Sequence, residues 1–232
     1  MSLQNEVQLI ALIGEGGFGE VFRAEWMGRQ VAAKRIKESH FVNDYNQRRK
    51  EFLVKKFKDE CQLLQIVKHS NIVEFYRVIA PPGESPIIIM ELLDRDLANL
   101  IRHSKTEPRV SFSDTVRIML DVAKGLRYLH KKSIVHRDLS SKNILLTREK
   151  RAKIADLGVA KIFESYFMTV TSVPGAEMYA APEVYGLKNP CKATYSSKVD
   201  IFSFGVVLLE VVVGQLPVYL VEPYNEGKVF KN

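Results

Sequence analysis

One short stretch, residues 136–146, constrains more than any other the fold that this sequence can adopt. It reads His-Arg-Asp-Leu-Ser-Ser-Lys-Asn-Ile-Leu-Leu, so the carboxylate of Asp138 comes five residues before the carboxamide of Asn143. The stretch runs from a turn into an apolar strand, and a second carboxylate, Asp156, follows after a hairpin's length of residues. Two carboxylates and an amide held in this way can bind a metal–nucleotide complex and accept a proton from an alcohol.

A second informative segment lies near the N-terminus, where residues 14–19 spell G-x-G-x-x-G. Its glycines are Gly14, Gly16, Gly17 and Gly19. A dinucleotide-binding fold needs a helix directly after such glycines, with the phosphate at the helix N-terminus. Residues 20–23 instead continue as a strand, which favours a loop whose backbone N–H groups approach phosphate oxygens. A dinucleotide fold and a purely structural glycine turn remain the alternatives.

Apolar periodicity divides the sequence into a strand-rich part and a helical part, with the change near residues 91–96. Ser111 with Asp114 three residues later is typical of a helix N-terminus, and Gly214 is typical of a helix C-terminus. The predicted elements are three strands within 7–36, a helix over 46–67, strands over 73–79 and 86–90, a helix over 111–130, strands over 144–146 and 153–155, and a helix over 200–213.

Glu60 stands on the apolar stripe of the helix predicted over 46–67, three residues after Phe57 and four before Leu64. A carboxylate that faces a core needs a partner, because burying it alone is costly. We expect that partner to be Lys34 on the third predicted strand. The alternatives are that Lys34 is an ordinary surface lysine and that Glu60 pairs with Lys56 along the helix surface.

Together these features resemble the catalytic domain of eukaryotic protein kinases, over about residues 10–217. Residues 136–143 match the pattern H-R-D-L-x-x-x-N, residues 14–19 match the Gly-rich loop, and residues 181–183 match the A-P-E motif. The sequences of 136–143 and 200–205 are similar to those of the tyrosine-kinase-like group.

The resemblance implies an α+β, bilobal protein-kinase-like fold, in which an antiparallel five-stranded N-lobe with one helix joins a mainly helical C-lobe. The implied limits are 1–90 for the N-lobe, 91–96 for the hinge, 97–217 for the C-lobe and 218–232 for a C-terminal tail. The family's C-lobe continues with several more helices, so the resemblance also implies that this C-lobe is incomplete and that the sequence is truncated at its C-terminus.

The resemblance also implies a role for each site residue. Asp138 orients the substrate hydroxyl and accepts its proton, with Lys34, Glu60 and Lys142 completing the catalytic set. Asn143 and Asp156 hold Mg²⁺, or Mn²⁺ in its place, against the phosphates of ATP. The residues expected to contact ATP are Gly14, Gly16, Gly17, Gly19, Val21, Ala32, Lys34, Met90, Glu91, Leu93, Asp96 and Leu145.

Four positions depart from the family pattern. Ser140 stands where Ser/Thr kinases usually carry Lys, and Lys142 stands where many tyrosine kinases carry Arg. Ala176 replaces the Thr that Ser/Thr kinases place before A-P-E, and Leu157 replaces the usual Phe of D-F-G. The lysine that faces the transferred phosphate has therefore either moved to Lys142 or been lost.

The implied function is ATP-dependent transfer of the γ-phosphoryl group to Ser/Thr hydroxyls of proteins, or to Tyr, in signalling. The alternatives are a catalytically impaired ATP-binding signalling module or kinase fragment, a small-molecule kinase of similar fold, and a basic nucleic-acid binder. The long segment between Asp156 and A-P-E favours a protein substrate. Phosphorylation by an upstream kinase or by the protein itself is expected there at Thr169, Thr171, Ser172 and Tyr166.

Composition is that of an ordinary globular protein, with 46% hydrophobic and 26% charged residues. Much of the net charge of +7 comes from residues 48–58, which read as a solvated helix face, so we expect no nucleic-acid partner. Cys61 and Cys191 have no metal-ligand spacing, and no signal peptide is apparent, which predicts a cytoplasmic protein with reduced thiols. The apolar run 206–213 contains Glu210 and is too short to span a bilayer.

Overall fold

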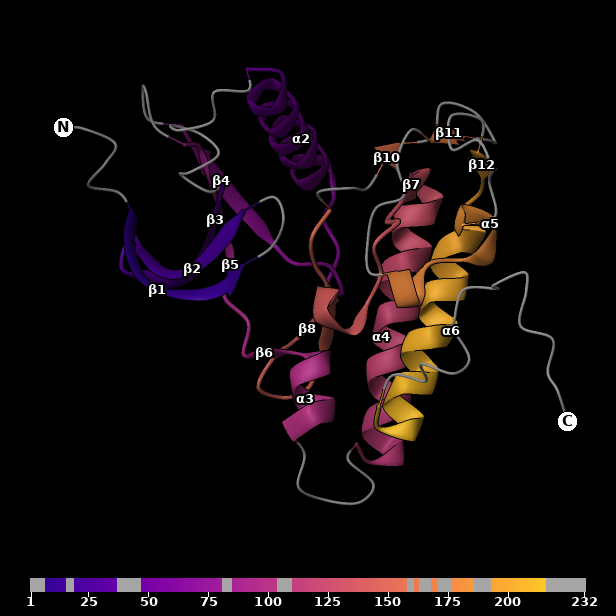
Figure 1. Cartoon of the computed structure of the whole chain (residues 1–232). Coiled ribbons are helices and arrows are strands. Elements are labelled where there is room, and N and C mark those ends of the chain that lie inside the picture. The colour runs from indigo at the N-terminus through magenta and orange to yellow at the C-terminus, as the bar shows by residue number, and fades with distance from the viewer. Residues whose placement is uncertain are drawn as a thin grey trace, which may run out of the picture. The chain divides into compact units, whose positions relative to one another are not determined.

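The computed structural model of the protein forms two compact units, residues 1–94 and 95–232, each considered below by itself (Figure 1). The limits predicted for lobes, hinge and tail stay a prediction. The structure describes residues 7–15, 19–36, 47–80, 85–103, 110–157, 161–162, 168–170, 177–185 and 193–215. Several predicted positions lie outside these ranges, namely Gly16, Gly17, Tyr166, Thr171, Ser172, Ala176 and Cys191.

Unit 1 is built on an antiparallel sheet of five strands, as the sequence predicts. Its spatial order is β1-β2-β3-β5-β4. The strands are β1 (Val7–Glu15), β2 (Glu20–Trp26), β3 (Arg29–Arg35), β4 (Phe75–Ile79) and β5 (Ile87–Glu91), and the helix of the unit is α2 (Gln47–Ile66). The predicted helix and the two later strands are confirmed to within two residues at each end.

The core of unit 1 surrounds the central strand β3. Val31 and Ala33 are fully buried and pack with Ala24, Ile79 and Ile89 of neighbouring strands. In a central strand both faces are covered, so the run from residue 31 to residue 34 is buried without alternation. The same burial reaches Lys34, and a buried ammonium needs a compensating charge.

Unit 2 is mainly helical, with α3 (Leu97–His103), α4 (Phe112–Lys131), α5 (Pro182–Tyr185) and α6 (Lys198–Val213). Figure 1 shows α4 and α6 side by side, and residues of the two helices are in contact. Short strands complete the unit: β6 (Arg95–Asp96) pairs with β8 (Ile144–Leu146) and β8 with β9 (Ala152–Ile154), β7 (Ile134–Val135) pairs with β10 (Lys161–Ile162), and β11 (Met168–Val170) pairs with β12 (Ala193–Tyr195).

The predicted helix ends are confirmed in α4 and α6. The Ser111 hydroxyl accepts a hydrogen bond from the backbone N–H of Asp114 at 3.1 Å, which is a capping contact at the start of α4. At the end of α6, Gly214 has a φ of 77° and donates its N–H to the carbonyl of Glu210 at 2.8 Å. The buried stripe of α4 includes Ile118, Val122, Leu126 and Leu129.

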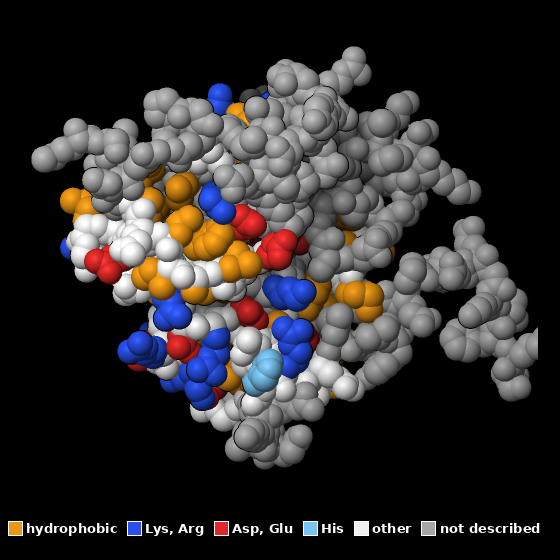
Figure 2. All heavy atoms as spheres, turned by 60° about the vertical axis from the view of Figure 1, so that its left-hand side comes forward, with side chains coloured by type: hydrophobic (Ala, Val, Ile, Leu, Met, Phe, Trp, Pro, Cys, Tyr) orange, Lys and Arg blue, Asp and Glu red, His pale blue; other side chains and the backbone are white. Residues whose placement is uncertain are grey.

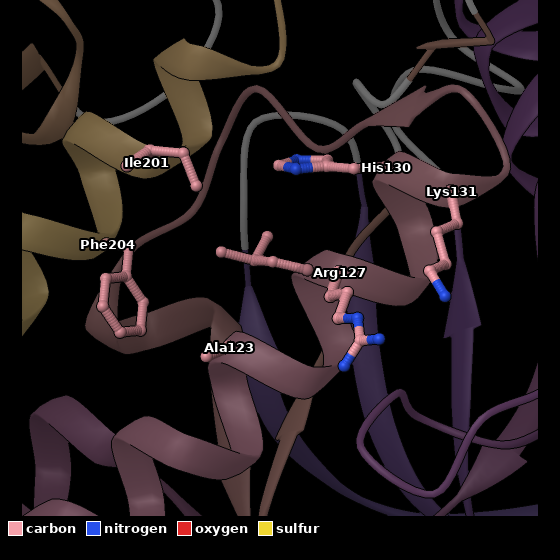
Figure 3. A pocket seen from close by; sticks show the side chains of 7 residues that line it. Ala123, Arg127, His130, Lys131, Ile201 and Phe204 are labelled. Atoms are coloured by element: carbon pink, nitrogen blue, oxygen red, sulfur yellow. The ribbon is translucent and has the colours of Figure 1, made fainter.

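A hollow of about 530 Å³ lies between α4 and α6 (Figure 3). Leu126, Ile201 and Phe204 supply apolar lining, while Arg127 and Lys131 extend together from α4. None of the predicted catalytic residues lines it, so this hollow is separate from the candidate site. Within the described residues, no helix has both the length and the apolar composition needed to cross a bilayer.

Candidate active site

In unit 1, the predicted partner of Glu60 is confirmed. The Lys34 Nζ atom donates to Glu60 Oε1 at 2.7 Å and to Oε2 at 2.9 Å. Lys34 lies on β3 and Glu60 on α2, and their residues are only 9% and 5% exposed. A buried pair of this kind fixes the lysine ammonium at one point on the sheet, because both carboxylate oxygens hold it.

The strand register brings further predicted ATP-contacting residues to one face of the sheet. Val21 lies directly opposite Lys34 in the β2–β3 pair, and Met90 lies opposite Ala32 in the β3–β5 pair. Directly opposed residues share a face, and residues two apart on one strand also share it. Val21, Ala32, Lys34 and Met90 therefore form one patch across three strands. Their contact with a nucleotide stays a prediction.

Gly14 and Gly19 are the glycines of the Gly-rich segment that the structure describes, and they differ in how much room they leave for a side chain. A Cβ on Gly19 would collide with the backbone carbonyl oxygen of Arg35, so this position has no room for a side chain. A Cβ on Gly14 would make only ordinary contact with Val21, at 3.6 Å. Close packing of the sheet therefore accounts for Gly19, while its predicted contact with phosphate stays a prediction.

In unit 2, Asn143 holds Asp138 by two hydrogen bonds. The Asn143 Nδ2 donates to the Asp138 carbonyl oxygen at 2.7 Å and to Asp138 Oδ2 at 3.1 Å. The 3₁₀ turn η2 (Ser141–Asn143) reverses the backbone so that residues five apart can meet. Both contacts use the amide nitrogen, and they orient the Asn143 side chain. The amide oxygen is the atom of this side chain that could bind a metal ion.

The β8–β9 hairpin places Asp156 at the same end as Asn143. Ile144 pairs with Ile154, and the backbone N–H of Ala155 donates to the Asn143 carbonyl at 2.8 Å. Asn143 and Asp156 therefore lie at the open end of the hairpin, opposite its turn. Asp156 is exposed and has a φ of 60°, a backbone conformation that costs free energy for a residue other than glycine and is often found at functional sites.

His136 has a structural role. It is fully buried, and its Nδ1 accepts the backbone N–H of Asp138 at 3.2 Å. This contact puts the ring proton on Nε2, which lies 2.9 Å from the carbonyl oxygen of Ala155. His136 therefore ties the loop that carries Asp138 to the residue that precedes Asp156.

Asp200 is a positioning residue that motif reading did not single out. Its fully buried carboxylate accepts the backbone N–H groups of His136 at 2.9 Å and Arg137 at 2.8 Å, and it lies 2.8 Å from His130 Nε2. The carboxylate thus fixes the backbone directly before Asp138. An acidic residue in the first turn of an otherwise apolar helix is the signal that points to it.

The structure also places three further predicted site residues in unit 2. The Asp96 Oδ1 accepts the backbone N–H of Asn99 at 2.6 Å, so Asp96 caps helix α3. Leu145 lies opposite Asp96 in the β6–β8 pair. Lys142 is exposed, on the turn between Asp138 and Asn143. The proposed contacts of all three with nucleotide or phosphate stay predictions, as do those of Glu91 and Leu93 in unit 1.

The donor atoms of Asn143 and Asp156 fit magnesium. Both residues supply hard oxygen ligands, and Mg²⁺ usually keeps several waters while binding one or two protein oxygens and substrate phosphates. Among the described residues, no group of three or more His, Cys, Asp and Glu side chains could hold a metal ion by itself. Asn143 and Asp156 therefore suit a magnesium ion that binds together with a nucleotide better than they suit a metal site made only of protein ligands.

Acidic side chains offset part of the basic surface. On the face shown in Figure 2, Lys and Arg side chains gather in the lower part of the view, with Asp and Glu among them. In unit 2, Asp114 pairs with Arg117 and accepts from Lys150 at 2.6 Å, and Asp121 binds Arg151 through two contacts of 2.7 Å. The hydrogen bond from Lys150 is the main reason that the pKa of Asp114 is lowered. Mixed charge of this kind is typical of a solvated surface.

Comparison with known proteins agrees with this geometry. A family model described as "Protein kinase domain" matches residues 7–229. The chain is 36% identical to a probable serine/threonine-protein kinase of Dictyostelium discoideum, over 88% of this chain and 32% of the relative. It is 34% identical to the calmodulin-binding receptor-like cytoplasmic kinase 3 of Arabidopsis thaliana, over 94% of this chain and 44% of the relative.

A third relative, the serine/threonine-protein kinase CTR1 of Arabidopsis thaliana, is 34% identical over 88% of this chain and 24% of the relative. In all three cases the chain spans less than half of the curated relative that it matches. The match to the family model nevertheless covers nearly the whole sequence, from the first strand of the sheet past helix α6. The chain therefore belongs to the protein kinase domain family.

Proposed function

We propose that this protein transfers the γ-phosphoryl group of ATP to Ser or Thr hydroxyls of protein substrates, as a kinase of the tyrosine-kinase-like group. The contact between Asp138 and Asn143 carries the proposal, since it holds a candidate base and a candidate metal ligand together at 3.1 Å. Two of the relatives are named serine/threonine-protein kinases, which supports the choice of Ser and Thr over Tyr.

Asp138 is the group that meets the acceptor. Its carboxylate orients the acceptor hydroxyl and takes the hydroxyl proton late in transfer, before releasing it to solvent. Asn143 donates to Oδ2 of Asp138 at 3.1 Å, which orients the carboxylate that we assign to the acceptor hydroxyl. When bound, Mg–ATP supplies the γ-phosphoryl group, whose bond to the ADP oxygen breaks as its bond to the acceptor oxygen forms.

Lys34 supplies positive charge to the nucleotide phosphates, and Glu60 keeps the ammonium in place. Asn143 and Asp156 offer oxygen ligands to the magnesium ion. Lys142, on the exposed face of the η2 turn, is the cation we assign to the transferred phosphate, because Ser140 cannot provide one. The patch of Val21, Ala32 and Met90 provides an apolar surface for the adenine ring.

Phosphate on the segment between Asp156 and Glu183 is the regulation we propose, at Thr169, Thr171, Ser172 or Tyr166. A phosphate there adds strong acceptor oxygens that can pair with basic side chains and order a loop. Arg137, directly before Asp138, is the candidate partner. We infer a cytoplasmic place of action, which is consistent with the free thiol of Cys61.

The test is to incubate the purified protein with Mg–ATP and to locate phosphate by intact-mass and peptide mass spectrometry, beside Asp138→Asn. The proposal expects phosphate on Ser or Thr of the wild type only. Equal absence of phosphate in both proteins, with ATP bound, would contradict it and would leave a nucleotide-binding module.

A further inference from the structure

The hollow of about 530 Å³ between α4 and α6 has two walls that differ in chemistry. Ile201 and Phe204 of α6 line one side of it (Figure 3). Arg127, His130 and Lys131 of α4 line the other side. None of the described residues that line the hollow is acidic. One wall is therefore apolar, and the opposite wall carries two permanent cations.

The apolar wall continues along α6 beyond the hollow. Ile201, Phe204, Leu208 and Val212 follow one another at intervals of three or four residues, which places them on one side of the helix. Ile201, Leu208 and Val212 are 49%, 38% and 65% exposed. A single exposed apolar side chain is common, but a row of them on one helix face marks a surface that binds another apolar surface.

The facing side of α4 changes from apolar to basic along its length. Val116 and Leu120 are exposed, and Arg127 and Lys131 follow on the same side of the helix. His130 Nε2 lies 2.8 Å from a carboxylate oxygen in the first turn of α6, so the basic end of α4 lies beside the start of α6. The cations are therefore at one end of the two-helix face.

No acidic side chain of either helix is available to neutralise these two cations. All four acidic residues of α4 and α6 are engaged elsewhere, namely Asp114, Asp121, Asp200 and Glu210. Arg127 and Lys131 are exposed, and they lie one turn apart. The charge that complements this end of the face must come from outside the two helices.

We propose that the hollow between α4 and α6 is a docking site for an amphipathic helix of a partner protein. The partner helix has an apolar stripe that packs on Ile201, Phe204 and Leu208, and acidic side chains on the flank that faces Arg127 and Lys131. This site is separate from the residues assigned to phosphoryl transfer, and its occupation does not require that activity.

A helix fits the site better than an extended peptide. Residues inside α4 and α6 satisfy their own backbone groups, so the two helices offer no row of free N–H and C=O groups such as a sheet edge provides. Two neighbouring helices instead present ridges of side chains, and the ridge of a third helix packs between them. The row from Ile201 to Val212 spans about three turns, roughly 16 Å, which is the length of a short docking helix.

Two other occupants fit the chemistry less well. A second copy of this chain would bring the same apolar row and the same two cations, and its own α4 and α6 would supply no carboxylate to Arg127 and Lys131. A membrane surface is broad, whereas the hollow lies between two helices and receives a narrow ridge. Both occupants are distinguished by the experiment below.

The test uses the full-length protein and two synthetic helical peptides of about sixteen residues. Both have the same leucine stripe in an alanine background, and the flanking positions carry glutamate in one peptide and lysine in the other. Fluorescence anisotropy measures the Kd of each labelled peptide. We expect the glutamate peptide to bind at least about tenfold more tightly than the lysine peptide, and Ile201→Ser to weaken its binding by about tenfold.

Charge reversal at the site gives the decisive comparison. The double variant Arg127→Glu/Lys131→Glu changes two exposed side chains, and we expect it to prefer the lysine peptide. The double variant Arg102→Glu/Arg148→Glu makes the same change in net charge at exposed positions outside the hollow, and it should keep the wild-type preference. A preference that Arg127→Glu/Lys131→Glu leaves unchanged, or that both double variants alter equally, would overturn the proposal.

Two further measurements on the wild type and Ile201→Ser identify the other occupants. Sedimentation velocity detects a dimer, and co-sedimentation detects binding to phosphatidylserine–phosphatidylcholine vesicles. We expect the wild type to stay monomeric and to leave the vesicles unbound. A dimer that Ile201→Ser abolishes would make the site an interface between copies, and vesicle binding that Ile201→Ser abolishes would make it a membrane contact. Either result would contradict a partner helix.

Discussion

Asn143 donates from its amide nitrogen to the side chain and to the backbone carbonyl of Asp138, so the candidate base and a candidate magnesium ligand are oriented by each other. Neither contact depends on unit 1. The loop that carries the candidate base is therefore held by contacts within unit 2, and a fixed orientation of this kind is what proton transfer requires.

Two substitutions of Asn143 should separate its effect on kcat from its effect on Mg²⁺ binding. Asn143→Ala removes the contacts to Asp138 and one metal ligand, so we expect kcat to fall at least about a hundredfold and the Mg²⁺ requirement to rise. Asn143→Asp keeps an oxygen ligand but removes the donor and places a like charge beside Asp138. We expect it to bind Mg²⁺ well and still lose kcat. Titration of activity with Mg²⁺ checks both, and a wild-type kcat in Asn143→Asp would contradict the positioning role.

The Lys34–Glu60 pair makes a prediction about stability that does not depend on activity. Lys34→Met leaves a buried carboxylate without its partner, which costs about 3–5 kcal/mol for pairs of this kind. The double variant Lys34→Met/Glu60→Leu removes both charges, so most of that loss should be recovered. Urea unfolding of the wild type, Lys34→Met, Glu60→Leu and the double variant checks this. A double variant as unstable as the sum of the single variants would show that the two side chains do not interact.

The pKa of Asp114 predicts how stability depends on pH. The hydrogen bond from Lys150, with a further one from Ser111, lowers the pKa of this carboxyl from its ordinary value of 3.8. A carboxyl whose pKa is lower in the folded state stabilises the fold above its unfolded pKa and loses this effect as the pH falls through the folded pKa. Lys150→Met should therefore be less stable than the wild type at pH 7, by about 0.5–1 kcal/mol for a partly exposed pair.

The difference between wild type and Lys150→Met should shrink below pH 3.8, where Asp114 becomes protonated in the unfolded state and then in the folded state. Lys124→Met, on the exposed face of α4, is the control and should show no such pH dependence. Denaturant unfolding from pH 7 to pH 2.5 measures both. A constant difference across that range would mean that Lys150 stabilises the fold without Asp114.

Cys61 should be inert in the folded protein. Burial, followed by the nearby Glu60 carboxylate, raises the pKa of its thiol to about 12, so the reactive thiolate is scarce at pH 8. In a Cys191→Ser background, we expect N-ethylmaleimide to label Cys61 only when denaturant opens the fold. Labelling of the native protein as fast as a free thiol would show that the core around α2 opens under native conditions.

Sequence reasoning succeeded where a long pattern or a buried charge gave a physical constraint. Helices α2 and α4 span twenty residues each, so their periodicity is well sampled. Glu60 on an apolar stripe required a cation, and the order of motifs left Lys34 as the candidate. The hairpin after Asn143 followed from two short apolar runs around a polar turn.

Other features could not be predicted because they depend on tertiary partners. Strands β6 and β7 have two residues each, too few for any periodicity. Asp96 caps α3, a contact that competes with the motif-based interpretation of the same residue. From the sequence, Glu210 served only as evidence against a membrane span. Its hydrogen bonds to Ser141 and Tyr179 join residues that are distant in the sequence, so no local pattern could predict them.

The central claim is that Asp138 acts as the base of a phosphoryl transfer, and a single-turnover experiment tests it most directly. Wild type and Asp138→Asn are compared at equal occupancy by Mg–ATP, with casein as the acceptor and labelled γ-phosphate as the readout. We predict equal Mg–ATP affinity and a transfer rate lower by at least about a thousandfold in Asp138→Asn. Equal transfer rates in the two proteins would contradict the account.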